Sequence, residues 1–140
     1  MTRTGGVRQK SQPPEPSRKE LLYLKAIANQ GHDTRLIDLS RSVGVASPSA
    51  LEELRHLEAK GFVENTRGLI SLTKRGRNVL KAHSRVHIAF ETLLAEHGVQ
   101  GPDVCEGIHE FDFALPMSMA SKVYKAAGRP RLCPDGHSEC

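Results

Sequence analysis

The second half of the chain contains two short runs in which metal-binding side chains recur at helical spacing. The runs are His83, His87 and Glu91, at intervals of four residues, and Cys105, His109 and Asp112, at intervals of four and three. Residues three or four apart share a helix face, so each run presents its polar groups together. Imidazole, thiolate and carboxylate groups bind transition metals, and burying them without a cation would cost free energy. Two helices packed side by side would therefore enclose a metal site.

Not every member of these runs is expected to be a ligand. An isolated histidine on an amphipathic helix is usually solvated, and we expect that of His83. Cys105 alone would be an ordinary buried thiol, but its pairing with His109 favours metal binding. A third group of donors lies in the C-terminal tail: Cys133, His137 and Cys140. The spacing of that group is as compatible with free thiols as with a metal site.

Capping signals and apolar periodicity predict the helices of the first half. Ser17 begins a capping box at the start of a helix over 18–30. A second helix, capped by Asp33 or Thr34, ends at Gly44. A third helix follows at once and ends at Gly61, with Ser47 as its cap and Pro48 in the first position. Residues 62–72 have the pattern of a two-stranded hairpin around a polar turn.

The helices of the second half are predicted by the same signals. Thr73 caps a long helix over about 74–97, which carries the first metal-binding run. The next helix carries the second run and an apolar stripe of Val104, Ile108, Phe111 and Leu115. A short helix over 117–127 completes the series. The fold class is therefore mainly α, with a winged helix-turn-helix followed by a helical metal-binding and dimerisation domain.

These elements predict four regions. Residues 1–16 are a disordered basic arm, residues 17–82 a winged helix-turn-helix, residues 83–128 the helical domain, and residues 129–140 a tail with cysteine and histidine. The apolar surface of residues 101–127 exceeds what one long helix can cover, which predicts a two-fold homodimer and a palindromic DNA target.

The charge distribution supports a DNA-binding first half. The 140-residue chain has a net charge of +4, but residues 1–83 carry +7 and residues 84–140 carry −3. Such asymmetry suggests that the first part meets a polyanion, although a basic solvated face is the alternative. The chain lacks both an apolar run long enough for a membrane span and a signal-peptide core, so we expect a cytoplasmic protein.

In a winged helix the second helix of the motif enters the major groove of double-stranded DNA. The residues expected at this interface are Arg35, Arg41, Ser47, Pro48, Ser49, Glu52, Arg55 and Arg67. Lys74 and Arg75 are further candidates for phosphate contacts. Glu52 is either a reader of cytosine or only the capping-box partner of Ser49.

The order of parts resembles the diphtheria-toxin-repressor family of iron- and manganese-dependent transcriptional regulators over about residues 17–136. The resemblance rests on the segments YLKAI, LEAKGFVE, LISLTKRG, HIAFETLL, DVCEGIHEFDFALP and LCPDGH. It implies metal-responsive repression of metal-homeostasis genes at a palindromic operator, with iron or manganese as cofactor. A thiolate ligand at Cys105 would favour zinc or ferrous iron over manganese. By resemblance, His87, Glu91 and Cys105 fall at the family's ancillary metal site, and His109 and Asp112 at its primary site.

The chain departs from the family's pattern at the primary site. Leu22 and Lys25 occupy positions where members have ligands on the first helix, and Phe113 stands where a histidine is usual. Either one site formed by His87, Glu91, Cys105 and His109, with Cys133, does the sensing, or the metal response has been lost.

Two other functions are compatible with the sequence. A regulator without metal would sense redox state through Cys105, Cys133 and Cys140. A metal-dependent hydrolase would use Glu110 or Asp112 as a base, but the chain contains no recognised catalytic motif and a winged helix would then have no task. We therefore expect the protein not to be an enzyme.

Overall fold

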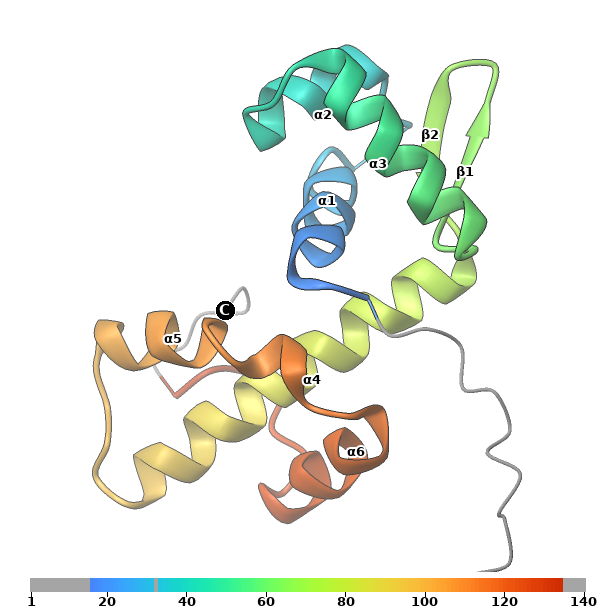
Figure 1. The fold of residues 1–140 in the computed structure, drawn as a ribbon. Helices are drawn as coiled ribbons and strands as arrows, with labels where there is room; N and C mark the ends of the chain where they lie inside the picture. Colours follow the sequence, from blue (N-terminus) through green and yellow to red (C-terminus); the bar gives the residue numbers. More distant parts are fainter. Residues whose placement is uncertain (1–15, 32, 135–140) are drawn as a thin grey trace, which may run out of the picture.

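The computed structural model describes residues 16–31 and 33–134. Its elements in chain order are α1 (Arg18–Asn29), α2 (Leu36–Val43), α3 (Ser47–Ala59), β1 (Val63–Thr66), β2 (Leu69–Leu72), α4 (Lys74–Glu96), α5 (Pro102–His109), the 3-10 helix η1 (Asp112–Ala114) and α6 (Met117–Ala126). The mainly helical fold with a small hairpin agrees with the predicted class. Figure 1 shows α4 running from the hairpin to the opposite end of the molecule, with α1–α3 on one side of it and α6 on the other.

The winged helix is built around an apolar core to which each of its elements contributes. The largest fully buried side chains of this core are Tyr23 and Leu24 of α1, Leu39 of α2, Leu54 and Leu57 of α3, and Phe62 and Ile70 of the wing. Ser17 forms the predicted capping box with Glu20. The Glu20 carboxylate also accepts a hydrogen bond from Lys60 Nζ at 2.6 Å, which ties α1 to the end of α3.

The wing includes one more backbone segment than the sequence predicts. β1 and β2 pair antiparallel, and Thr34 forms an isolated bridge with Ile70. The Thr34 amide donates to the Ile70 carbonyl at 2.9 Å, and the Ile70 amide donates to the Thr34 carbonyl at 2.7 Å. Thr34 is buried by this pairing, and Arg35 takes the N-cap position of α2 without a side-chain cap. The prediction that Asp33 or Thr34 caps α2 is therefore wrong.

The turn between α2 and α3 has the predicted form, but the cap of α3 is shifted by one residue. Gly44 ends α2 in the left-handed conformation, with φ of 77°. Ala46 rather than Ser47 is the N-cap of α3, and the Ser47 hydroxyl lies 3.4 Å from that of Ser40. Because the helix starts before Ser49, the capping-box role considered for Glu52 is also wrong.

The long helix α4 is joined closely to the wing. Thr73 caps it as predicted, accepting a hydrogen bond from the Gly76 amide at 3.1 Å. The Thr73 hydroxyl in turn donates to the Gly61 carbonyl at 2.6 Å. A Cβ placed on Gly76 would lie 2.1 Å from the carbonyl oxygen of Phe62, so the helix can approach the wing this closely only with glycine at this position.

The helix after α4 is shorter than its apolar stripe predicts. α5 ends at His109, and the chain then forms η1 before α6 begins at Met117, so the predicted continuation of the helix through Phe111 and Leu115 is wrong. The break turns Asp112 inward, where it is buried against histidines, and leaves Phe111 46% exposed with its ring edge against Phe90. The short helix predicted over 117–127 is confirmed by α6.

No described helix is long and apolar enough to cross a membrane.

Candidate metal centre and nucleic-acid interface

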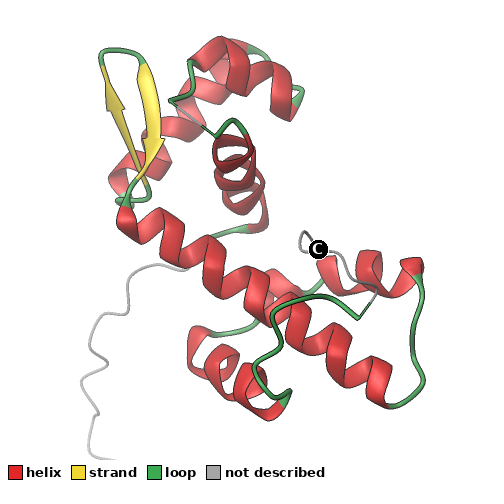
Figure 2. Cartoon of the chain, turned by 180° about the vertical axis from the view of Figure 1, so that it is seen from behind, coloured by secondary structure: helices red, strands yellow, loops and turns green. Residues whose placement is uncertain are grey.

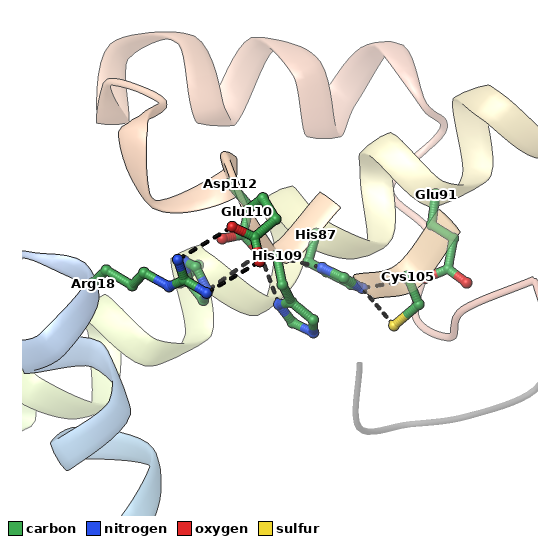
Figure 3. A network of polar contacts seen from close by, with 8 residues as sticks. Arg18, His87, Glu91, Cys105, His109, Glu110 and Asp112 are labelled. Carbon is green, nitrogen blue, oxygen red and sulfur yellow. Dashed lines mark hydrogen bonds and ion pairs between the residues drawn. The ribbon is translucent and has the colours of Figure 1, made fainter. Parts of the chain in front are cut away.

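Three elements bring the metal-binding side chains together near the middle of the molecule. His83, His87 and Glu91 come from one face of α4, Cys105 and His109 from α5, and Asp112 from η1. Figure 3 shows the side chains of His87, Glu91, Cys105, His109 and Asp112 converging between the helices. The two runs that share helical spacing in the sequence thus meet in space.

His87 lies at the centre of this cluster and is fully buried. Its Nδ1 is 3.2 Å from Asp112 Oδ2, while its Nε2 is 3.3 Å from Glu91 Oε2 and 3.4 Å from Cys105 Sγ. With Nδ1–H donating to Asp112, the lone pair of Nε2 is directed at Glu91 and Cys105. A carboxylate that holds the far nitrogen of a histidine fixes its tautomer and ring orientation, as is usual for metal-binding histidines.

The same carboxylate oxygen of Asp112 organises the other two histidines. His109 Nδ1 is 3.1 Å from Asp112 Oδ2, and His83 Nε2 is 3.4 Å from it. Burial by itself would raise the pKa of Asp112, but the hydrogen bond from His87 and the charges of the nearby histidines hold that pKa below its usual value. Asp112 is therefore an ionised carboxylate in the centre of the cluster.

His83 is not the solvated residue that the sequence predicts. Its side chain is only 9% exposed, and burial lowers its pKa to about 4. Burial also lowers the pKa of His109, and the charge of His87 acts in the same direction. Both imidazoles are consequently neutral at pH 7, with a lone pair available for a cation. The position of His83, four residues before His87 on α4, is the sequence signal that could have identified His83 as a member of the cluster.

The donor atoms of the cluster form three overlapping groups that could each hold a metal ion. These groups are His87 with Cys105 and His109, His83 with His109 and Asp112, and His87 with Glu91 and Cys133, and within each the donor atoms lie within 4.8 Å of one another. All six side chains predicted as ligands therefore lie near one another, and His83 is a further member of the cluster. A donor set of imidazoles, buried carboxylates and a thiol fits a transition metal such as zinc or iron.

The tail contributes differently from the helices. Cys133 is buried beside His87 and Glu91, and it is disulfide-bonded in the structure, so its sulfur would have to be reduced before it could bind a metal. Cys105 is not disulfide-bonded. His137 and Cys140 lie outside the described residues.

A cavity of about 310 Å³ separates part of this cluster from α1. His83, His109 and Asp112 line one wall, and Leu22 and Lys25 of α1 lie on the other. Phe113 also lines the cavity and contributes no donor atom. The three possible metal-binding groups among the described residues include none from α1.

The contact between α1 and the cluster is instead an ion pair. Arg18 donates from both terminal nitrogens to the two carboxylate oxygens of Glu110, at 3.2 and 3.3 Å. Glu110 stands between His109 and Asp112 in the chain, so α1 is tied to the segment that carries two donors (Figure 3). The sequence contained no signal for this pair, which joins residues 92 positions apart.

The residues predicted to contact DNA lie on the surface of the winged helix. The exposed members of this set are Arg35, Arg41, Pro48, Ser49, Glu52, Arg55 and Arg67, whereas Ser47 is half-buried. Arg67 is at the tip of the hairpin, where its backbone has a positive φ of 53°. Arg75 is half-buried with its guanidinium over the Phe62 ring, which makes it a packing residue rather than a free cation.

Solved structures with the same arrangement of elements include metal-dependent regulators. A hypothetical protein from Sulfolobus solfataricus is 28% identical, with a TM-score of 0.77 over 89% of this chain and 99% of that one. IdeR from T. acidophilum is 27% identical, with a TM-score of 0.59 over 87% of this chain and 59% of its own. A manganese-dependent transcriptional repressor in complex with manganese is 25% identical, with a TM-score of 0.60 over 84% of this chain and 60% of its own. The resemblance to the diphtheria-toxin-repressor family is confirmed.

The likeness to this family has a defined extent. The chain spans 57–60% of the length of the named regulators of the diphtheria-toxin-repressor family that it matches. ScaR with bound Zn²⁺ matches at 18% identity and a TM-score of 0.70, which shows the shared fold. No protein-family model and no curated protein matches the sequence.

Proposed function

We propose that the protein is a metal-dependent, DNA-binding transcriptional regulator, and specifically a repressor of metal-homeostasis genes. The observation that carries this proposal is a cluster of His, Cys and carboxylate side chains that forms against the long helix α4, which begins at the wing and supplies His83, His87 and Glu91. The proposal assigns residues 17–82 to DNA binding and residues 83–128 to metal binding and dimerisation. The basic arm, residues 1–16, precedes these regions and the tail, residues 129–140, follows them.

The proposed metal ligands are the residues whose donor atoms gather around His87. They are His83, His87, Glu91, Cys105, His109 and Asp112, with Cys133 when it is reduced. A thiolate beside imidazoles and carboxylates favours zinc or ferrous iron over manganese, which prefers oxygen ligands. The metal, when bound, would supply positive charge beside the buried Asp112 and Glu91 carboxylates.

The proposed DNA interface is the exposed side of α3 together with the wing. Pro48, Ser49, Glu52 and Arg55 face the major groove in this proposal, and Ser47 lies at the start of the same helix. Arg35, Arg41 and Arg67 contact phosphates, which fix position without reading sequence. Two such winged helices in a two-fold dimer would bind a palindromic operator.

A homodimer is proposed because apolar side chains remain exposed on the helical domain. Phe111 is 46% and Met119 49% exposed, whereas Ile108, part of the predicted stripe, is buried within the protomer and is unavailable for an interface. Sedimentation at micromolar concentration should give a dimer of about twice the 15.4 kDa chain mass. A monomer under these conditions would contradict the dimer.

The test of the function combines metal analysis with DNA binding. Protein purified under reducing conditions is analysed for bound elements, and footprinting on DNA upstream of its own coding sequence compares the metal-loaded and chelator-treated forms. We expect zinc or iron at about one ion or more per chain and protection only in the loaded form. Equal protection by both forms would overturn metal dependence.

One observation favours a second candidate, a regulator that senses redox state. Cys133 is disulfide-bonded in the structure, and the Cys105 sulfur lies 3.4 Å from His87 Nε2. With Cys140, these residues would form the sensor without metal. Thiol titration and DNA binding are measured on anaerobic and oxidised samples, each with and without chelator. In the chelator-treated protein, the DNA affinity of a redox sensor changes with the oxidation state of its thiols. The DNA affinity of a metal sensor does not.

A further inference from the structure

The cations of residues 84–140 are concentrated in one place. This stretch has a net charge of −3, yet its five Lys and Arg residues are Arg85 on α4, Lys122 and Lys125 on α6, and Arg129 and Arg131 directly after α6. Residues 117–131 contain four of them and no Asp or Glu. An acidic domain thus has a strongly basic face around α6.

Three of these arginines line one cavity between α4 and α6. The cavity has a volume of about 630 Å³, within the range of sites for small organic ligands. Arg85, Arg129 and Arg131 line it together with Tyr124, and Met117 and Ala120 supply apolar surface. No acidic side chain belongs to the lining, and none of the described carboxylates forms an ion pair with the three arginines.

Two features hold the arginines in position. The Arg85 guanidinium lies over the Tyr124 ring, 5.3 Å from its centroid, which orients it without neutralising its charge. Arg129 has φ of 53°, a left-handed conformation that is costly for a side chain other than glycine or asparagine. It follows Gly128 and donates its amide to the Tyr124 carbonyl at 3.0 Å. Strained backbone of this kind is concentrated at functional sites.

The cavity is separate from the two sites already described. Figures 1 and 2 show α6 on the side of α4 opposite to α1–α3, so the cavity does not face the proposed DNA surface. None of its lining residues belongs to a metal-binding group. The charged groups that a ligand in this cavity would meet are therefore the three arginines.

We propose that this cavity binds a small organic phosphate that carries at least two negative charges. Guanidinium groups bind phosphate oxygens through paired hydrogen bonds, and three of them around one cavity match a multiply charged anion. The apolar side of the cavity receives the organic part of the ligand. The site adds a small-molecule input, independent of metal, to the helical domain.

The test measures binding of defined anions to the full chain in the presence of chelator, at about 150 mM salt. Calorimetry with inorganic pyrophosphate, ADP and citrate separates phosphate from carboxylate recognition, and shows whether an organic body adds affinity. The chain has no Trp and two Tyr, of which Tyr23 is buried in the winged-helix core. A change of tyrosine emission on adding pyrophosphate therefore reports on Tyr124.

Two double variants with the same change of charge give the decisive comparison. R129N/R131Q removes two arginines from the cavity, and Asn is chosen because it tolerates a positive φ. K122Q/K125Q removes two exposed lysines of α6 that do not line the cavity. We expect the first to weaken pyrophosphate binding about ten-fold or more, from the loss of charge-assisted hydrogen bonds, and the second less than about three-fold.

Several results would overturn the proposal. These are the absence of saturable binding by the parent, equal losses in the two double variants, and citrate binding more tightly than either phosphate. Thermal unfolding verifies that each variant is folded. If R129N/R131Q does not fold, the single variant R131Q, which keeps Arg129 at its positive φ, replaces it in the comparison.

Discussion

His87 uses its two ring nitrogens for different purposes. One nitrogen is held by Asp112, and the other faces Glu91 and Cys105. In the proposed site, the Cys105 thiol is the donor that sets the metal preference while Cys133 is disulfide-bonded, because the other donors are then nitrogen and oxygen.

Replacing Cys105 by serine is expected to change the metal preference. Cys105→Ser should weaken zinc or ferrous iron by about ten-fold or more and manganese much less, because only the first two gain from a thiolate. In the parent, apparent zinc affinity should rise with pH up to about 8.5, the ordinary thiol pKa, since binding displaces the thiol proton. Competition titrations with a chromophoric chelator measure both effects. Full zinc affinity in Cys105→Ser would show that Cys105 is not a zinc ligand and would make Cys133 the candidate thiolate.

The buried histidine His83 predicts acid sensitivity of the metal-free protein. Its pKa falls from 6.5 unfolded to about 4 folded through burial, opposed by Asp112 and aided by the charges of Lys25, His109 and His87. Between these values the unfolded chain binds more protons, so the stability that neutral His83 contributes is complete above pH 6.5 and is lost as the pH falls towards 4. Urea unfolding from pH 7 to pH 4 in chelator should show this decline, and His83→Gln should flatten it. If the free energy of unfolding of His83→Gln fell with pH as steeply as that of the parent, groups other than His83 would cause the acid sensitivity.

The metal-binding residues could be predicted from the sequence much better than their surroundings. His87, Glu91, Cys105 and His109 follow from i, i+4 spacing, which places donors on one face whatever the tertiary structure. Local spacing does not reveal burial, and for that reason His83 was assigned to solvent. The Arg18–Glu110 pair depends on how two distant helices meet, which no local pattern specifies.

At the scale of elements, the coupling between α1 and the metal cluster is the least conventional feature. α1 provides no donor atom among the described groups, and Arg18 instead binds Glu110 between two donors. Both side chains are more than half exposed, so the pair contributes little to stability by itself. Its value would lie in transmitting the position of η1 to the winged helix.

A charge exchange tests this coupling. Arg18→Glu and Glu110→Arg should each leave metal affinity within about three-fold and reduce the gain in DNA affinity that metal produces, because like charges would push α1 from η1. The combined variant R18E/E110R should recover much of that gain. Electrophoretic mobility shifts with and without zinc provide the measurement, and a double variant no better than the single ones would show that the pair does not transmit the signal.

The elements themselves were largely predictable, and the errors have local causes. Capping residues and glycines located α1, α4 and the turn at Gly44 because these signals act within a few residues. The cap of α2 was missed because Thr34 pairs with Ile70 across the wing. The predicted length of α5 was too great because Asp112 turns inward to contact three histidines. These contacts require a break in the helix, although the apolar spacing of Ile108, Phe111 and Leu115 would suit its continuation.

For the whole molecule, the basic first half predicts that DNA binding depends strongly on salt. Each lysine or arginine that contacts a phosphate releases counterions, so the logarithm of affinity falls linearly with the logarithm of salt concentration. Arg41→Gln and Arg67→Gln should each weaken binding to all sequences alike and reduce that slope by about one. Lys122→Gln, with the same charge change on α6, is the matched control and should leave the slope unaltered. Affinity that does not vary with salt would contradict DNA binding through this face.

Gly76 determines where the molecule can change shape. Because even a methyl group at this position would meet the Phe62 backbone, we expect the wing and the start of α4 to move together. On the other side of the winged helix, α1 is joined to the end of α5 by the exposed Arg18–Glu110 ion pair, beside the cavity of about 310 Å³. We therefore expect any displacement between the winged helix and the helical domain to occur at the contact between α1 and the α5–η1 segment, and not where the wing meets α4.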